Sequence, residues 1–438
     1  MNRRKFWGAL VLFSLIGQVA WVVENMYFNV FIYHMFKASP EQIALMVQAS
    51  AIAATLTTLF IGALSDRLGK RKAFITVGYI LWGVSILCFA FLRVDWIRAL
   101  LPSGTQDEAE IAAKAASIGV TLVIVFDCIM TFFGSTANDA CFNAWLTDST
   151  DETNRGKAEG LNAMMPLVAI LVVFGGTMWA KHENAQHWTV IYLILGGIVI
   201  AAGILGFFLI DESAKPEKQT EGYFATLFYG FRPRVIRNNA NLYLSLLGFT
   251  IFGISIQVFM PYLILYYTVT LGLDNYVLIM APAILLAAVA TAFYGRFYDR
   301  IGYGKSLIPA LCVLLLGYTI LFLFKSTALV FIGSLLMMCG YLCGMAVFGA
   351  RIRDCTPMGM AGRFQGLRII GQVLIPGVIG PEIGKLVLRN AEVYINEDKT
   401  QSFIPNANIF LWAGIVLLPI AIVILCERLR ARKEAQHA

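Results

Sequence analysis

Six ionisable side chains stand within long apolar runs of this 438-residue sequence. They are Glu24, Asp127, Asp139, Arg368, Glu382 and Lys385. A charged side chain at mid-membrane depth costs about 2.5–3.5 kcal/mol on insertion scales, so each of them is a candidate for function. Carboxylates in such a place can bind the hydroxyl groups of a solute or carry protons. The residue types therefore favour solute binding and proton transfer within the membrane.

The first of these runs holds the stretch WVVENMYFNVF, which begins at Trp21 and contains Glu24. Gln18, Asn25 and Asn29 fall on one helical face, and Trp21 and Glu24 fall on the adjoining face. Together they form a polar and aromatic wedge on an otherwise apolar helix, and we expect all five to bind substrate. The alternative for the amides is a structural patch of hydrogen bonds between helices.

Asp127 lies near the middle of the fourth apolar run, and we expect it to bind substrate as well. Glu24 and Asp127 are also the candidates for the coupling ion, because a low-dielectric cavity favours the protonated form of a carboxylic acid. In the second half of the chain, the predicted substrate-binding residues are Gln257, Tyr262, Arg368 and Gln372. The central acids thus lie in the first half and mostly uncharged groups in the second, which suits a neutral, polyol-like substrate. For Arg368 the alternative is a side chain that snorkels to the membrane surface.

The elements that must position these residues are membrane helices. The chain is 58% hydrophobic and only 14% charged, with a mean hydropathy of +0.72, whereas a soluble domain has about 25% charged residues. Runs long enough to cross a bilayer recur along the whole sequence. They predict an all-α polytopic membrane protein with twelve membrane-spanning helices. The predicted spans are 7–36, 40–64, 73–93, 117–147, 158–181, 188–210, 240–270, 276–297, 305–325, 327–350, 363–388 and 407–427.

Lysine and arginine residues fall unevenly on the two sides of these spans. The side that carries both termini has 24 of them and the opposite side has nine, with Arg368 left inside a span. By the positive-inside rule this bias places both termini in the cytoplasm, as in the inner membrane of a bacterium. The net charge of +7 is therefore a topology signal and gives no reason to expect a nucleic acid partner. The expected partners are the lipid bilayer, a small-molecule substrate and a coupling cation, and we expect a monomer.

Two internal matches relate the first half of the sequence to the second. The segment GALSDRLGKRK, which starts at Gly62, matches GRFYDRIGYGK, which starts at Gly295, at an offset of 233 residues. A second match, at an offset of 206 residues, pairs Asp148 with Asp354. The offsets differ by 27 residues, which predicts an insertion in the first half. Within this insertion, the helix-forming residues 107–117 are expected to extend the fourth span outward.

These matches predict two parallel six-helix halves, residues 1–210 and 240–438, joined by a cytoplasmic linker at residues 211–239. Transporters that alternate access around a site at the membrane midplane have this layout. The motifs HExxH, GxSxG and Walker A are all absent from the sequence, and so is CxxC. We therefore expect a transporter that has no enzyme activity, no cofactor and no metal site.

The loop from Gly62 to Arg71 resembles the signature of the major facilitator superfamily, Gly-x-x-x-Asp-Arg-x-Gly-Arg/Lys-Arg. It stands in the usual place for that family, between the second and third spans, and a degenerate copy in the second half is also typical of the family. The resemblance covers the whole chain. It implies twelve helices in two pseudo-symmetric halves that rock against each other around a central site.

Charged residues around these loops are candidates for gates on the cytoplasmic side. The carboxylate of Asp66 can reach the N-terminal end of a helix in the other half, where the helix dipole would stabilise it. Arg67 and Arg71 can form ion pairs with Asp148 or Glu159. The alternative is that these charges only fix topology and loop packing. The predicted gating residues are Asp66, Arg67, Arg71, Asp139, Asp148, Asp299, Arg300 and Asp354.

The stretch NAWLTDST, which begins at Asn143 and is followed by Arg155, resembles the glycoside–pentoside–hexuronide carriers, the melibiose group of cation symporters. The resemblance implies symport of a sugar or glycoside, with carboxylates on spans 1 and 4 at the sugar and carboxylates on spans 2 and 4 at the cation. Residues 42–65 of the second span contain no acid, which favours a proton over Na⁺ as the coupling ion.

Two other functions stay open at this point. The first is an exporter of amphipathic compounds, either a drug/H⁺ antiporter or a lipid flippase. Antiporters of the superfamily typically carry a Gly-Pro-rich signature on the fifth span. Here the span has Met164-Met165-Pro166 with no glycine directly before it, which weakens that alternative. The second is a sensor or scaffold that does not transport, which would not need paired gates and buried acids.

Overall fold

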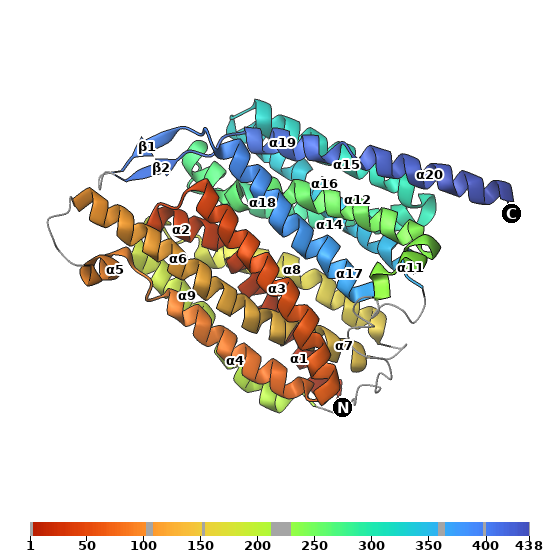
Figure 1. The fold of residues 1–438 in the computed structure, drawn as a ribbon, viewed down its shortest axis with the longest axis horizontal. Coiled ribbons are helices and arrows are strands. Elements are labelled where there is room, and N and C mark those ends of the chain that lie inside the picture. Colours follow the sequence, from red (N-terminus) through yellow and green to blue (C-terminus); the bar gives the residue numbers. More distant parts are fainter. Residues whose placement is uncertain are drawn as a thin grey trace. The chain divides into compact units, whose positions relative to one another are not determined.

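The computed structural model describes residues 3–101, 108–150, 154–211, 229–357, 364–396 and 400–437 (Figure 1). Within these residues, twelve helical segments are long and apolar enough to cross a membrane. The prediction of a twelve-span, all-α membrane protein is therefore confirmed. Several spans consist of more than one helix, because wider π-helical turns interrupt them.

Contacts between residues divide the chain into two compact units. The first unit comprises Met1–Thr220 together with Glu392–Phe403, and the second comprises Glu221–Ala391 together with Ile404–Ala438. The helices of the first unit are α1 (Arg3–Val22), η1 (Val23–Tyr27), α2 (Phe28–Phe36), α3 (Pro40–Leu68), α4 (Arg71–Phe89), α5 (Val94–Leu100), α6 (Glu108–Gly134), η2 (Ser135–Phe142), α7 (Asn143–Asp148), α8 (Arg155–Thr177) and α9 (Ala185–Leu209).

The second unit repeats this helical design. Its helices are η3 (Tyr229–Phe231), α11 (Pro233–Asn238), α12 (Ala240–Phe259), η4 (Met260–Tyr262), α13 (Leu263–Leu265), η5 (Tyr266–Thr270), α14 (Val277–Ile301), α15 (Tyr303–Leu323), α16 (Thr327–Cys355), α17 (Gln365–Ile369), η7 (Ile370–Leu374), α18 (Ile375–Leu388), α19 (Asn408–Leu417) and α20 (Ile420–His437). We call the end of each unit at which its first span begins the terminal end, and the opposite end the far end.

Local sequence sets the ends of α3. Ser39 accepts a hydrogen bond from the backbone N–H of Gln42, and the Gln42 side chain accepts one from the backbone N–H of Ser39. This reciprocal capping box, with Pro40 in the first helical turn, starts the helix. Gly69 ends it at a φ of 62°, a left-handed conformation that glycine adopts without strain.

Small residues allow the helices of the first unit to pack closely. A Cβ atom on Gly83 of α4 would lie 2.7 Å from the backbone oxygen of Gly196 of α9, so these two backbones touch. Close packing through glycine is a common means of association between membrane helices, where lipid is as apolar as the side chains. The outward surface of α3 is correspondingly apolar, with Leu45, Leu56 and Phe60 each about half exposed.

Two features of the far end were not predicted from the sequence. The first is the short helix α5, which precedes α6. Helix α6 itself begins at Glu108, which confirms the expected outward extension of the fourth span from that residue onward. A two-stranded antiparallel hairpin, β1 (Val393–Ile395) and β2 (Gln401–Phe403), follows α18 and belongs to the first unit. The hydroxyl of Tyr33 donates to the carbonyl of Phe403 at 2.6 Å, and their rings pack edge to face.

Candidate functional site

Among the described residues, four π-helical turns interrupt the membrane spans, and three of them contain predicted site residues. Glu24 and Asn25 lie in η1, Asp139 lies in η2, and Gln372 lies in η7. The fourth, η5, contains none of them. A π-turn adds a residue to one helical turn and so shifts the side chains that follow, and such turns are frequent at functional sites.

Glu24 is held by two hydroxyl groups from neighbouring helices. Its Oε1 atom accepts hydrogen bonds from Ser50 of α3 at 2.7 Å and from Thr131 of α6 at 2.9 Å. The two hydroxyl oxygens are themselves 2.9 Å apart. Three spans therefore meet at one carboxylate, which is only 6% exposed.

The protons in this triangle can be counted. Three oxygen–oxygen contacts need three protons to be hydrogen bonds at once, and the two hydroxyl groups supply one proton each. The third proton is available when Glu24 is a neutral acid, because each oxygen of the triangle then donates once and accepts once. When Glu24 is ionised, both hydroxyl groups point to it and the contact between Ser50 and Thr131 has no proton.

Asp127 lies one helical turn before Thr131 on α6 and is 1% exposed. It interacts electrostatically with Glu24. Its Oδ1 atom is buried without a hydrogen-bond partner among the described residues, as is Oε2 of Glu24. Neither carboxylate forms an ion pair within the part of the chain that the structure describes. The structure thus brings together the two acids that the sequence singled out, both buried and without an ion-pair partner among the described residues.

The predicted amides of the first span bond mainly to their own helix. The side chain of Asn25 donates to the carbonyl of Trp21 at 2.8 Å, and that of Asn29 donates to the carbonyl of Asn25 at 3.0 Å. Asn25 is exposed, Asn29 is fully buried, and Gln18 is partly exposed. The ring of Trp21 packs against that of Trp82 with centroids 5.1 Å apart.

A second cluster of buried polar side chains, Asn138 and Tyr79, lies closer than Glu24 to the terminal end of the first unit. The side chain of Asn138 donates to the hydroxyl of Tyr79 at 2.7 Å, and this hydroxyl donates to the carbonyl of Phe13 at 2.9 Å. Gly17 on α1 leaves the space for the Asn138 amide. Asp139 is partly exposed and accepts from Ser135 at 3.1 Å.

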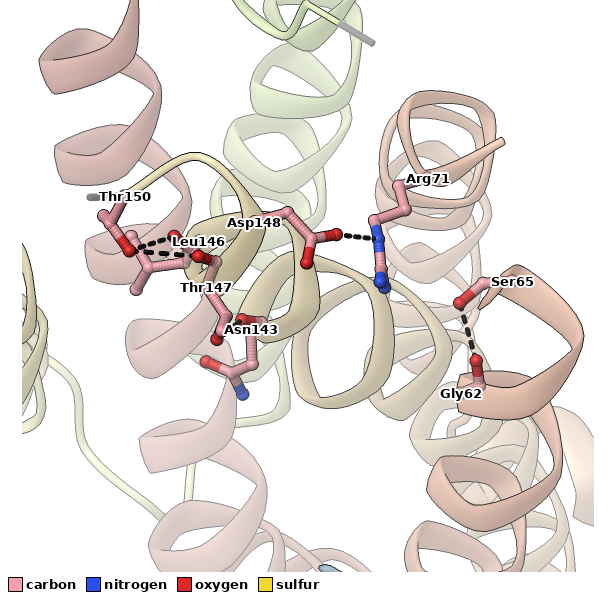
Figure 2. Close-up of polar contacts among 8 residues, drawn as sticks. All are labelled: Gly62, Ser65, Arg71, Asn143, Leu146, Thr147, Asp148 and Thr150. Atoms are coloured by element: carbon pink, nitrogen blue, oxygen red, sulfur yellow. Dashed lines mark hydrogen bonds and ion pairs between the residues drawn. The ribbon is translucent and has the colours of Figure 1, made fainter. Parts of the chain in front are cut away.

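At the terminal end of the first unit, the predicted ion pair between Arg71 and Asp148 is present. Nε of Arg71 lies 2.6 Å from Oδ2 of Asp148, with 9% and 24% of the two side chains exposed (Figure 2). Beside it, the hydroxyl of Ser65 donates to the carbonyl of Gly62 at 2.9 Å, within the last turns of α3 (Figure 2). Arg67 is exposed. The predicted role of the Asp66 side chain falls outside the described residues.

The corresponding end of the second unit has a different partner for the matching acid. Asp354 accepts a hydrogen bond from the hydroxyl of Tyr298 at 2.5 Å, while Asp299 and Arg300 are exposed. The repeat thus keeps the acid at the end of the tenth span but replaces the ion pair of the first unit with a neutral donor.

The predicted substrate-binding residues of the second unit differ in how deeply they are buried. Gln372, Arg368 and Gln257 are partly exposed, whereas Tyr262 is fully buried. Gly380 packs directly on Gln257, since a Cβ atom there would lie 2.3 Å from the Gln257 Cβ. Helices α12 and α18 are therefore in close contact at this level.

Sequence reasoning missed two polar residues of the site in the first unit and one buried acid in the second unit. Ser50 bonds to Glu24 and Thr131, and Tyr79 bonds to Asn138. Glu427, a buried acid on α20, accepts from Ser245 at 2.8 Å. The signal available in the sequence was a polar residue on the inward face of a membrane helix, but the sequence does not show which face is inward.

The model of the major facilitator superfamily matches residues 7–381 of the sequence. The chain belongs to this superfamily. It is a transporter of small molecules and not an enzyme, and it is a multi-pass membrane protein. No curated protein matches the sequence.

Solved structures of this superfamily share the fold across nearly the whole chain. The nucleoside transporter NupG matches with a TM-score of 0.70 and 11% identity, over 97% of this chain and 99% of NupG. A D-xylose–proton symporter matches with a TM-score of 0.67 and 14% identity, over 97% of each chain. The xylose transporter XylE from E. coli matches with a TM-score of 0.65 and 14% identity, over 95% of this chain and 98% of XylE.

Proposed function

We propose that this superfamily member is a proton symporter of a sugar or glycoside that works by alternating access. The observation that carries the proposal is the triangle of Glu24, Ser50 and Thr131, with Asp127 beside it. All three of its hydrogen bonds form only when a proton is present. The protonated site has one more hydrogen bond than the ionised site, and this difference suits proton coupling.

The proton is favoured over Na⁺ by the groups around the two acids. A sodium ion needs several oxygen ligands at once, and residues 42–65 of the second span contribute no carboxylate. The α3 group that reaches Glu24 is the hydroxyl of Ser50, and it is already engaged with Glu24 and Thr131. A proton needs only one acceptor oxygen, and Oε1 of Glu24 stands in the triangle that one proton completes, while Oδ1 of Asp127 has no hydrogen-bond partner among the described residues.

A neutral, hydroxyl-rich substrate suits the residues that remain. Amides and hydroxyl groups, which both donate and accept, match sugar hydroxyls. Among the structural relatives, NupG is a nucleoside transporter, XylE is a xylose transporter, and another is a D-xylose–proton symporter. The resemblance of residues 143–150 to the glycoside–pentoside–hexuronide carriers points to the same class of substrate.

The gates of the proposed cycle lie at the terminal ends of the two halves, residues 1–210 and 240–438, which are joined by a cytoplasmic linker at 211–239. The charge bias of the loops supports a cytoplasmic location for these ends, in a bacterial inner membrane. The ion pair of Arg71 and Asp148 holds the loop between α3 and α4 to the end of the fourth span. In the proposal, this contact is made in one state and broken in the other.

The test is uptake of radiolabelled mono- and oligosaccharides into proteoliposomes, with a pH gradient, with a Na⁺ gradient, and with neither. The proposal predicts accumulation of at least one sugar that depends on the pH gradient alone. Accumulation driven only by Na⁺ would refute proton coupling. Movement of a lipophilic cation or a lipid, with no sugar accumulated, would refute the symporter and favour the exporter.

Two variants assign the coupling to the acids. Glu24→Gln and Asp127→Asn are each expected to abolish accumulation against a gradient, while Glu24→Gln retains exchange of internal for external substrate. The matched control is Glu382→Gln, which removes a membrane carboxylate that is paired with Lys385 at 2.5 Å in the second unit. Unchanged accumulation in Glu24→Gln would remove Glu24 from the coupling role.

A further inference from the structure

The strands β1 and β2 are attached to one unit by the chain and to the other unit by packing. In the sequence they follow α18 and precede α19, and both of these helices belong to the second unit (labelled in Figure 1). By their contacts, however, residues Glu392–Phe403 group with the first unit. A segment whose two covalent attachments lie in the second unit is therefore held in place by the first.

Tyr33, in the last turn of α2, makes the attachment to the first unit. Its hydroxyl donates to the carbonyl of Phe403 at 2.6 Å. The two rings stand at 90° to each other, with centroids 5.2 Å apart. Tyr33 is 1% exposed and Phe403 is 5% exposed, so bulk water does not compete for this hydrogen bond. These contacts fix the end of β2 to the first span.

Asn396 ties the two strands into one piece. Its side chain donates to the carbonyl of Thr400 at 3.0 Å and to the hydroxyl oxygen of Ser402 at 2.9 Å. Its backbone N–H donates to the same Thr400 carbonyl at 2.8 Å. The strands are paired in register, with Val393 opposite Phe403. When the end of β2 moves, both strands must therefore move with it.

The chain has almost no slack between β2 and the second unit. Two residues after Phe403, the carbonyl of Pro405 accepts a hydrogen bond from the hydroxyl of Thr270, the last residue of η5. Pro405 is buried, and its ring restricts its own φ. Two residue steps reach at most about 7 Å when fully extended. Any larger movement of Pro405 away from the first unit must therefore pull Phe403 along.

We propose that Tyr33 and Phe403 form a latch for the far end of the transporter. Their hydrogen bond is made while the far end is closed and is released each time the far end opens. The proposal rests on the proposed function, because alternating access requires the two units to move relative to each other. The opening movement carries Pro405, and with it Phe403, away from Tyr33. Tyr33 is thus a positioning residue of the transport cycle.

The latch differs in its chemistry from the triangle at Glu24. Its donor is a phenol and its acceptor is a backbone carbonyl, and both are neutral at the pH of transport. The latch therefore responds to the movement of the units and not to the coupling proton. Loss of the latch should change how readily the far end opens and leave the pH dependence of coupling as it is.

The first experiment joins the two residues by a removable link. Tyr33→Cys combined with Phe403→Cys is treated in proteoliposomes with a short bis-methanethiosulfonate, and transport of the radiolabelled sugar is measured before and after dithiothreitol. We expect the link to abolish both accumulation and exchange, and dithiothreitol to restore them. The matched control is Val393→Cys with Phe403→Cys, a pair that faces across β1 and β2. Its link does not attach the hairpin to α2, so transport should continue.

Two results would overturn the latch. The first is full transport by a protein in which mass spectrometry shows positions 33 and 403 linked in most molecules. The second is the absence of this link under conditions that join positions 393 and 403. The single variants Tyr33→Cys and Phe403→Cys, treated in the same way, account for reaction with the native cysteines.

Tyr33→Phe keeps the latch testable if the double variant is poorly made. It removes the hydroxyl and keeps the ring, so exchange of internal for external sugar should become about five-fold faster at every pH, because the far end opens more readily. The control is Tyr27→Phe. Tyr27 is a fully buried tyrosine of the same span, and its hydroxyl bonds to Thr177 at 2.7 Å within the first unit. This control should be less stable without faster exchange.

Unchanged or slower sugar exchange in Tyr33→Phe would contradict the latch. The proposed function fails separately, if the unmodified protein moves a lipophilic cation or a lipid and no sugar. In that case the same link is tested with the compound that is moved, because opening of the far end is needed whichever compound is carried. Full movement of that compound by the linked protein would then overturn the latch as well.

Discussion

Replacement of Gly17 by alanine tests whether the polar network beside Glu24 has the geometry described above. A Cβ atom on Gly17 would lie 1.6 Å from Nδ2 and 2.8 Å from Cγ of Asn138, and 2.7 Å from the hydroxyl oxygen of Tyr79. Two atoms that are not bonded to each other cannot lie 1.6 Å apart, so the amide of Asn138 must move. It then loses its 2.7 Å hydrogen bond to Tyr79.

The expected cost follows from these contacts. Loss of the buried hydrogen bond costs about 1–3 kcal/mol, and displacement of packed neighbours costs about another 1–3 kcal/mol. Alanine recovers up to about 1 kcal/mol through its better helix propensity. We therefore expect Gly17→Ala to lower the free energy of unfolding by about 3 kcal/mol.

The measurement is unfolding by SDS titration in mixed micelles, with Gly8→Ala as the matched control. Gly8 is on the same helix, and a Cβ atom there would meet only Leu209, at an ordinary 3.9 Å. The control should be neutral or slightly stabilising. In an Asn138→Ala background the cost of Gly17→Ala should fall by at least about 1 kcal/mol, because the clashing amide is gone. Equal effects at Gly17 and Gly8, or an undiminished cost in the Asn138→Ala background, would refute the reasoning.

Three further predictions concern other contacts. Asp148→Asn should destabilise the protein by about 1–3 kcal/mol, since it removes the charge opposite a largely buried Arg71. The double variant Arg71→Asp with Asp148→Arg should recover part of this loss in the same SDS titration, and no recovery would argue against a specific pair. Tyr33→Phe removes the 2.6 Å bond to β2 and should cost about 1 kcal/mol, with faster hydrogen exchange in the hairpin as the readout; unchanged exchange would show that the bond does not hold it. Ser50→Ala should reduce coupled accumulation about five-fold, the effect of one hydrogen bond of about 1 kcal/mol. A loss as complete as that of Glu24→Gln would refute the expectation that Ser50 contributes a single hydrogen bond.

The sequence alone determined the class of the protein and the position of its two central acids. Apolar runs of the right length have one stable solution in a bilayer, the helix, because every backbone polar group must be satisfied within the segment. Twelve such runs predict twelve spans, and the family model confirms the superfamily. Glu24 and Asp127 were identifiable because a charge is conspicuous in an apolar run.

The ion pair between Arg71 and Asp148 was also predictable, for a different reason. Arg71 begins α4 and Asp148 ends α7, each next to a loop of a recurrent sequence pattern. The span count places both helix ends at the same membrane surface. Few partners are available there, so charge and topology narrowed the choice to Arg67 or Arg71 with Asp148 or Glu159, and the structure shows Arg71 with Asp148. The matching acid of the second unit shows the limit of this reasoning, since Asp354 bonds to Tyr298, which no charge pattern identifies.

Only the tertiary structure decided which neutral groups meet the acids. Ser50 and Thr131 come from two different helices, and their meeting at Glu24 depends on the rotation and depth of each helix in the bundle. A sequence of nearly uniform hydropathy does not fix these, because membrane helices bury no more apolar surface in one rotation than in another. They are set by packing, through contacts such as that of Gly83 with Gly196. The sequence therefore located the charges, and the packing of the helices selected the hydroxyl groups that determine what those charges can do.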